Sequence, residues 1–273
     1  MLTGTYLAKK QDGSIYFRSS ITYKNKHISL GSFQNEQDAH LCYIEANNLL
    51  TSDTSLEAFF LNSKLSFDKW VSLINFRDHN VYFKNPIYLK KSYFCYYFSP
   101  HDFLIFDFED LFYYSQHKIM KRKGHLFVAD YGMQVTLMNR YGVKNYGVKD
   151  KDYRFVNGNP NDFRYHNIEI LNSYHGVSKK IKQSKTMFQA KIHINGNIII
   201  GIYDTEEKAA IAYNKAIDLL KTIGIEKNFT QNYLENVTAL NYAEIYTALQ
   251  LSPNFKKMLL QNGFPIERKS ILK

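Results

Sequence analysis

GSFQNEQDAHLCYIEANNLL at residues 31–50 and GIYDTEEKAAIAYNKAIDLL at residues 201–220 are two copies of one pattern, and this repeat decides the fold. Seven of the twenty aligned positions are identical: Gly31/Gly201, Glu36/Glu206, Ala39/Ala209, Tyr43/Tyr213, Ala46/Ala216, Leu49/Leu219 and Leu50/Leu220. The similarity extends upstream, because FRSSITYKNKHISLG (17–31) matches FQAKIHINGNIIIG (188–201) if the turn of the first copy is one residue longer. The shared order of hairpin and helix predicts two related units.

The upstream part of each copy is predicted to be a β-hairpin. In the second copy an apolar series alternates with a polar series, which is the pattern of a strand with one covered face. The apolar residues are Phe188, Ala190, Ile192 and Ile194, and the polar residues are Gln189, Lys191 and His193. Asn195-Gly196 is a hairpin-turn signal, and IIIGIY then returns as the next strand.

The downstream part of each copy is predicted to be a helix with one apolar face. In the second copy Asp204 and Glu207 have the spacing of a capping box, and in the first copy Asn35 is the expected cap. Residues at helical spacing then form one stripe, Ala209, Tyr213, Ala216 and Leu220 in the second copy and Ala39, Tyr43, Ala46 and Leu50 in the first. Each unit is therefore expected to be a small sheet with a helix on one face. The other face is left to solvent or a ligand.

These units resemble the ethylene-response-factor DNA-binding domain of plants, the Apetala-two fold. The resemblance rests on residues 176–220, with a Gly-Val start, basic strands, an aromatic residue after a glycine and an alanine-rich helix, and on KNF at 227–229. Residues 4–50 resemble the domain more weakly. In that family the sheet lies in the major groove of DNA, which is wide enough for a β-ribbon. The resemblance implies double-stranded DNA as the partner.

Candidate DNA-binding residues follow from the uncovered strand faces and the basic stretches before them. They are Lys9, Lys10, Arg18, Ser20, Thr22 and Lys24 in the first unit, and Lys179, Lys180, Lys182, Lys185, Gln189, Lys191 and His193 in the second. Lysines mostly contact phosphates, whereas Arg18 and Gln189 are types that pair with base edges. A solvated polar face is the alternative that this pattern leaves open.

The segment at about 101–172 resembles the His-Asn-His (HNH) nucleases that are often fused to Apetala-two-like units. The resemblance rests on Asn157-Gly158-Asn159, followed by Arg164 and Asn167. It implies an acidic metal ligand and a catalytic histidine on the strand before this turn, but those positions hold Arg154 and Phe155. The earlier His-Arg pair of the family reads Asn139-Arg140, and His166 stands beyond the turn.

An arginine repels a metal ion and a phenylalanine has no basic group, so we expect the nuclease chemistry to be lost. Arg154 is then a further candidate for DNA contact, and the remaining turn residues are vestigial. The expected protein has no catalytic residue and no cofactor. The alternative is an active HNH endonuclease with an atypical metal site, which would need magnesium or another divalent metal.

Composition restricts the function further. The 273 residues carry a formal charge of +10 with a pI near 9.3, which favours a polyanionic partner. No apolar run is long enough to span a membrane, and the amino-terminal residues are too polar for a signal peptide, so we expect a cytoplasmic, nucleoid-associated protein. Two cysteines, Cys42 and Cys95, are expected to be buried. A third interpretation is an interaction protein that docks a partner on exposed aromatic residues, Tyr93, Phe94, Tyr96, Tyr97 and Phe98.

The predicted fold class is α+β, with a degenerate ββα nuclease-like middle between the two units. The expected segments are a first DNA-binding unit (1–55), an aromatic-rich connection (56–100), the HNH-like segment (101–173), a second DNA-binding unit (174–237) and a helical extension (238–273). The predicted function is non-catalytic, sequence-preferring binding of double-stranded DNA by a regulator or accessory protein of a phage or mobile element.

Overall fold

The computed structural model describes residues 1–225 and 227–261. The fold is α+β, as predicted, and within the described residues it has four three-stranded antiparallel sheets and one two-stranded sheet. The chain divides into two compact units, which are described separately below. Unit 1 contains residues 1–137 and 155–167, and unit 2 contains residues 138–154 and 168–273. The boundary predicted between residues 173 and 174 therefore falls inside unit 2.

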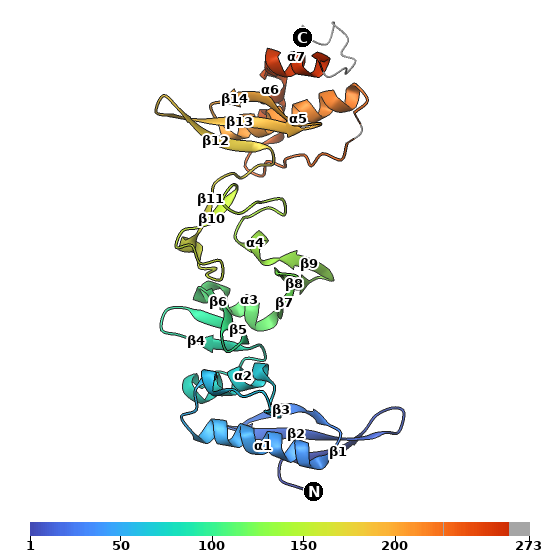
Figure 1. Ribbon diagram of the computed structural model, residues 1–273, viewed down its shortest axis with the longest axis vertical. Helices are drawn as coiled ribbons and strands as arrows, with labels where there is room; N and C mark the ends of the chain where they lie inside the picture. Colours follow the sequence, from blue (N-terminus) through green and yellow to red (C-terminus); the bar gives the residue numbers. More distant parts are fainter. Residues whose placement is uncertain (226, 262–273) are drawn as a thin grey trace. The chain divides into compact units, whose positions relative to one another are not determined.

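Unit 1 begins with the first copy of the repeat (Figure 1). Its sheet consists of β1 (Thr5–Lys9), β2 (Ile15–Tyr23) and β3 (Lys26–Phe33), and α1 (Glu36–Thr51) covers one face. The predicted cap is confirmed, because the Asn35 side chain accepts a hydrogen bond from the Asp38 N–H. Ala39, Ala46 and Leu50 of the predicted stripe are buried against the sheet.

The rest of unit 1 continues the core of the first copy. Its elements are η1 (Leu56–Ala58), α2 (Phe67–His79), β4 (Ile87–Leu89), β5 (Phe94–Ser99), β6 (Asp102–Phe106), η2 (Phe108–Asp110), α3 (Leu111–Gln116), β7 (Ile119–Arg122), β8 (His125–Asp130), β9 (Met133–Thr136) and η3 (Tyr165–Asn167). The interpretation of residues 93–98 as an exposed docking surface is wrong. Phe94, Tyr96 and Tyr97 are 0–5% exposed because both faces of the central strand β5 are covered.

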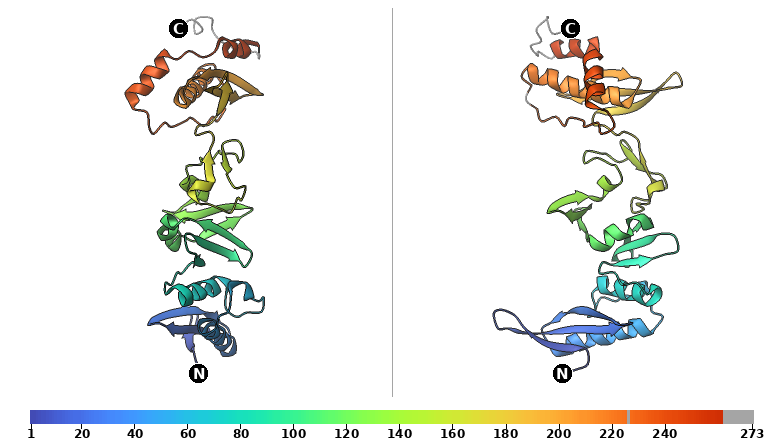
Figure 2. Two further views of the ribbon diagram at one scale, coloured as in Figure 1. Left: turned by 90° about the vertical axis from the view of Figure 1, so that its left-hand side faces the viewer. Right: turned by 180° about the vertical axis from the view of Figure 1, so that it is seen from behind.

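Unit 2 contains the second copy of the repeat. β12 (Val177–Lys182), β13 (Lys185–His193) and β14 (Asn197–Tyr203) form its sheet, and α5 (Glu206–Thr222) covers one face (Figures 1 and 2). The other elements are β11 (Ile168–Ile170), α6 (Ala239–Ala248) and α7 (Pro253–Gln261), while α4 (Leu137–Arg140) and β10 (Tyr153–Phe155) lie where the chain changes units. The helices predicted at about 242–249 and 255–260 are thus confirmed, and the predicted end at Asn262-Gly263 lies outside the described residues.

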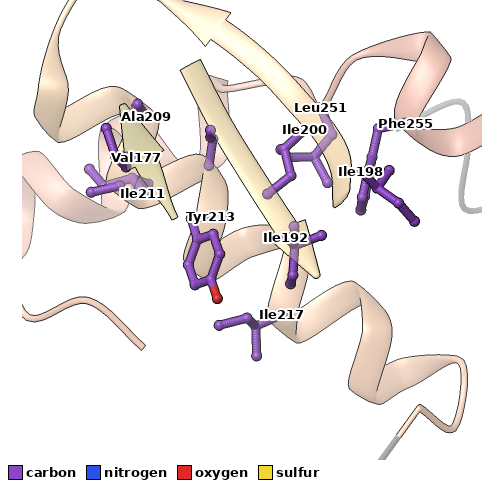
Figure 3. Close-up of a cluster of buried hydrophobic side chains, with 14 of the residues drawn as sticks. Val177, Ile192, Ile198, Ile200, Ala209, Ile211, Tyr213, Ile217, Leu251 and Phe255 are labelled. Carbon is purple, nitrogen blue, oxygen red and sulfur yellow. The ribbon is translucent and has the colours of Figure 1, made fainter. Parts of the chain in front are cut away.

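The core of unit 2 lies between the sheet and its helices (Figure 3). Val177, Ile192 and Ile200 of the sheet pack against Ala209, Tyr213 and Ile217 of α5, and Leu251 and Phe255 close the cluster from the carboxyl-terminal side. All four residues of the predicted α5 stripe are at most 2% exposed. The predicted cap is corrected, because Thr205 accepts the Lys208 N–H, whereas Asp204 forms an ion pair with the Lys208 side chain.

The two copies match in detail as well as in order. Both sheets have a bulge at the same point, opposite Ser19 and Ser20 of β2 and opposite Ala190 and Lys191 of β13, and the extra residues are Leu30 of β3 and Ile200 of β14. The N–H after each bulge donates to a glycine carbonyl, Ser20 to Gly4 at 3.1 Å and Lys191 to Gly176 at 2.7 Å. Thr22 pairs with His27 across the first turn, and four residues lie between them. The equivalent pair across the second turn is His193 and Asn197, with three residues between them, so the prediction of a longer first turn is confirmed.

The expected ββα arrangement does not form around the Asn157-Gly158-Asn159 turn. Strands β10 and β11 pair with each other, and between them the only helical segment is the single 3-10 turn η3. The side chain of Asn167 closes the turn, and the chain continues after it as the strand β11.

Candidate nucleic-acid interface

The face of the unit 2 sheet opposite α5 is the strongest candidate for binding a ligand, and we call it the outer face. Val177, Ala190 and Ile192 point toward α5, so the residues between them point outward. The register then places these residues on the outer face: Ser178, Lys180 and Lys182 of β12, Lys185, Met187, Gln189, Lys191 and His193 of β13, and Asn197, Ile199 and Ile202 of β14. No helix of the described residues covers this face (Figure 2).

The charge of the outer face is uncompensated. Residues 174–203 contain five lysines and no acidic residue. In the part of the chain that the structure describes, Lys180, Lys182, Lys185 and Lys191 form no ion pair, whereas some lysines elsewhere do, as Lys121 does with Asp102 at 2.8 Å. Clustered cations without counter-charges repel one another, and a bound polyanion removes that repulsion.

A groove borders this face. It lies between the loop at residues 146–152 and strands β12 and β13, with a volume of about 450 Å³. Lys151, Lys180 and Lys191 line it together with His175, Ser178 and Asp152. The Asp152 carboxylate is engaged by the protein, because it accepts hydrogen bonds from the Val148 N–H at 2.9 Å and the Asn172 amide at 3.3 Å. The groove therefore offers three lysine ammonium groups against one carboxylate that is already hydrogen-bonded.

The outer face of unit 1 has a different chemistry at the same positions. Where unit 2 has Ser178, Lys180 and Lys191, unit 1 has Tyr6, Ala8 and Ser20. Arg18 is exposed and donates to the Tyr16 hydroxyl from Nε at 3.1 Å and from Nη2 at 2.7 Å, with its guanidinium over the Tyr16 ring. Thr22 is exposed and lies 3.3 Å from the His27 ring nitrogen.

Several predicted DNA-binding residues are not on an accessible outer face. Gln189 and Ser20 are 9% and 7% exposed, because they lie on the central strands between the side chains of both neighbours. Lys9 and Lys179 are exposed but lie on the helix side of their strands, in register with Thr5 and Val177. Lys24 contacts the Arg77 carbonyl and the Asn80 side chain at the end of α2. Arg154 pairs with Glu169 at 2.7 Å.

The residues that carry the HNH resemblance hold a turn together. Asn167 is 1% exposed, accepts the Asn157 N–H at 2.8 Å and donates to the Asp162 carbonyl at 2.8 Å. Arg164 pairs with the buried Asp162 at 2.6 Å. Burial raises the pKa of Asp162, but the hydrogen bonds from Arg164 and Asn157 outweigh that effect and hold it below its ordinary value. Phe155 is buried against Phe163.

No group of three or more potential metal ligands is found among residues 1–225 and 227–261. Asn139 and Arg140 lie in α4, and His166 lies in η3. Sequence reasoning missed the wall of the groove at residues 146–152, because its residues meet the segment before β12 through contacts between distant parts of the chain, among them Asn172 with Asp152 and Tyr146 with Ser173. No helix of the described chain has both the length and the apolar character to cross a membrane.

Comparisons of the chain with protein-family models, with curated proteins and with solved structures find no match. The two family resemblances therefore stay predictions that rest on the residues quoted above.

Proposed function

We propose that this chain is a non-catalytic protein that binds double-stranded DNA through the outer faces of its two three-stranded repeat sheets. The observation that carries the proposal is the row of unpaired lysines on the outer face of unit 2, at Lys180, Lys182, Lys185 and Lys191. A strand pair of this kind fits the major groove, and lysines on it would contact the phosphates on either side. Arg18 is the remaining candidate for base contact, because Gln189 is buried. A role as a regulator or accessory protein of a phage or mobile element is supported only by the family resemblances.

Binding should depend steeply on salt. Each neutralised phosphate contributes about −0.9 to the slope of log K against log salt concentration, so four lysine contacts predict a slope of about −3.6. The measurement is fluorescence anisotropy of a labelled duplex of mixed sequence between about 50 and 200 mM salt. Lys180→Ala should weaken binding and reduce the slope, whereas Lys179→Ala, its neighbour on the opposite face, is the matched control and should change both much less. A flat salt dependence would contradict the proposal.

The same protein should leave supercoiled plasmid intact in the presence of magnesium or manganese. Arg154 and Phe155 stand where the nuclease family has its acid and histidine, and Asn167 and Asp162 are engaged in the turn. Metal-dependent nicking that Asn167→Ala abolishes would instead support the endonuclease alternative.

A further inference from the structure

The groove of unit 2 has features that the open sheet of unit 1 lacks. Its three lysines come from two different parts of the chain, Lys151 from the loop wall and Lys180 and Lys191 from the sheet. The equivalents of Lys180 and Lys191 in unit 1 are Ala8 and Ser20, although both sheets share the same bulge and register. The shared fold therefore does not require these cations.

The spacing of the lysines favours an extended ligand. Lys191 lies directly opposite Gly176 across the sheet, because its N–H donates to the Gly176 carbonyl at 2.7 Å. Lys180 lies four residues after Gly176, so the two lysines stand on different rows of paired residues. A strand advances about 3.3 Å per residue, so the two rows are roughly 13 Å apart. Separate phosphates of one chain could occupy such rows, whereas a single phosphate group would occupy only one.

Other groups in the groove fit phosphate oxygens as well. The Ser178 hydroxyl is buried and has no hydrogen-bond partner in the part of the chain that is described, so it is free to donate to an acceptor. Burial, and then the nearby Lys151, lower the pKa of His175, while its ring packs edge-on against Tyr146 and Tyr213. The lysines, and not this histidine, therefore provide the positive charge at neutral pH.

We propose that this groove holds one phosphodiester strand of the bound DNA, with the loop at residues 146–152 as its outer wall and Lys151, Lys180 and Lys191 on separate phosphates. This inference rests on the proposed DNA-binding function and makes unit 2 the main electrostatic anchor. It adds a contact from outside the repeat, because Lys151 belongs to neither copy.

Amine footprinting of the unaltered protein tests the groove directly. The protein is acetylated with a lysine-specific reagent, alone and with a 20-base-pair duplex or with inorganic polyphosphate, a phosphate chain without bases. Lys151, Lys180 and Lys191 should be protected several-fold by both probes, while Lys179 and Lys221, which lie away from the groove, should react as in the free protein. Inorganic orthophosphate at the same phosphate concentration should give no comparable protection.

Affinity measurements provide the second readout. Lys180→Ala combined with Lys191→Ala should lower duplex affinity about tenfold or more and make the salt slope less steep by about 1.8. Lys151→Ala alone should make it less steep by about 0.9. Lys179→Ala combined with Lys221→Ala removes the same charge elsewhere in unit 2 and should have little effect on the slope.

The outcomes separate the two proposals. Salt-dependent duplex binding without protection of the three lysines overturns the groove and leaves DNA binding intact. Protection by polyphosphate without any duplex binding supports a phosphate-chain site in the groove, but it overturns the DNA-binding function and the assignment of this site to a DNA strand. Binding of neither probe overturns both.

Discussion

At the scale of single residues, two glycines explain one identity of the repeat, Tyr43 and Tyr213. Gly4 and Gly176 have φ values of 76° and 73°, and a Cβ there would lie 2.2 Å from the Tyr43 ring or 2.3 Å from the Tyr213 ring. Each tyrosine thus fills the space that a side chain at the glycine would need. The identical Glu36 and Glu206 have a matching role, since each accepts hydrogen bonds from the segment that leads into the first strand, from Thr5 and from Ser173.

Gly176→Ala should therefore destabilise unit 2 strongly. The new methyl group would meet the Tyr213 ring and the Lys191 carbonyl, which a Cβ would approach to 2.6 Å, at a positive φ. Overpacking costs about 1–3 kcal/mol, and alanine at positive φ costs about 1–2 kcal/mol more. The measurement is urea unfolding followed by circular dichroism.

Gly224→Ala is the matched control in the same unit. Gly224 has a φ of 81°, but no atom lies within 4 Å of its added Cβ, so only the backbone cost of about 1–2 kcal/mol applies. Equal losses for the two variants would show that the contact with Tyr213 does not matter.

At the scale of elements, the two repeat helices use one position in opposite ways. Glu45 of α1 accepts hydrogen bonds from the N–H groups of Lys64 and Leu65 and from the Ser63 hydroxyl. At the equivalent position of α5, Lys215 donates to the carbonyls of Tyr246 and Leu249, both at 2.7 Å. The charge at this position therefore determines which backbone groups of the following segment bind to the helix. They are N–H groups in unit 1 and carbonyl groups in unit 2.

Lys215→Met should detach α6 from α5. The change keeps most of the side-chain stem but leaves two carbonyls at the end of α6 without their donor, which costs about 1–3 kcal/mol. Burial, and then Lys256, lower the pKa of Lys215, which is consistent with a partly desolvated ammonium group.

Amide hydrogen exchange measures this effect locally. Exchange in residues 239–248 should accelerate relative to the wild type, while β12–β14 should keep their protection. Lys221→Met removes an exposed lysine from the same helix and is the control. Unchanged exchange in α6 would mean that apolar contacts alone hold this helix.

The elements were predictable from sequence to the extent that they depend on local patterns. Alternation in residues 188–194, the turn at Asn195-Gly196 and the cap at Asn35 all involve residues close in the chain, and the structure confirms them. The accessibility of Gln189 was not predictable, because it depends on neighbouring strands on both sides. The groove was not predictable either, since Lys151 and Lys191 lie forty residues apart and no local pattern links them.

At the scale of the whole molecule, the excess of positive charge is unevenly distributed between the two repeat sheets. The formal charge of +10 indicates a polyanionic partner but not where that partner binds. In unit 2 the lysines lie unpaired on the outer face, whereas the outer face of unit 1 offers chiefly Arg18 with Tyr6 and Tyr16. We infer that the two units contribute differently, unit 2 through phosphate contacts and unit 1 through an arginine that could read a base or stack on one.

If both units bind one DNA molecule, affinity should rise with duplex length more than the number of available sites accounts for. Binding of the second unit is then intramolecular and benefits from a raised effective concentration. A duplex of about 10 base pairs is one helical turn and should accommodate a single unit, while one of about 40 base pairs leaves room for both. Anisotropy titrations with both duplexes measure the ratio of affinities, corrected for the number of overlapping sites.

Arg18→Ala with Lys10→Ala should reduce the affinity for the long duplex and leave that for the short duplex nearly unchanged, because unit 2 still binds it. An unchanged affinity for the long duplex would mean that unit 1 takes no part in DNA binding. An equal loss on both lengths would mean that the two units do not bind one DNA molecule together.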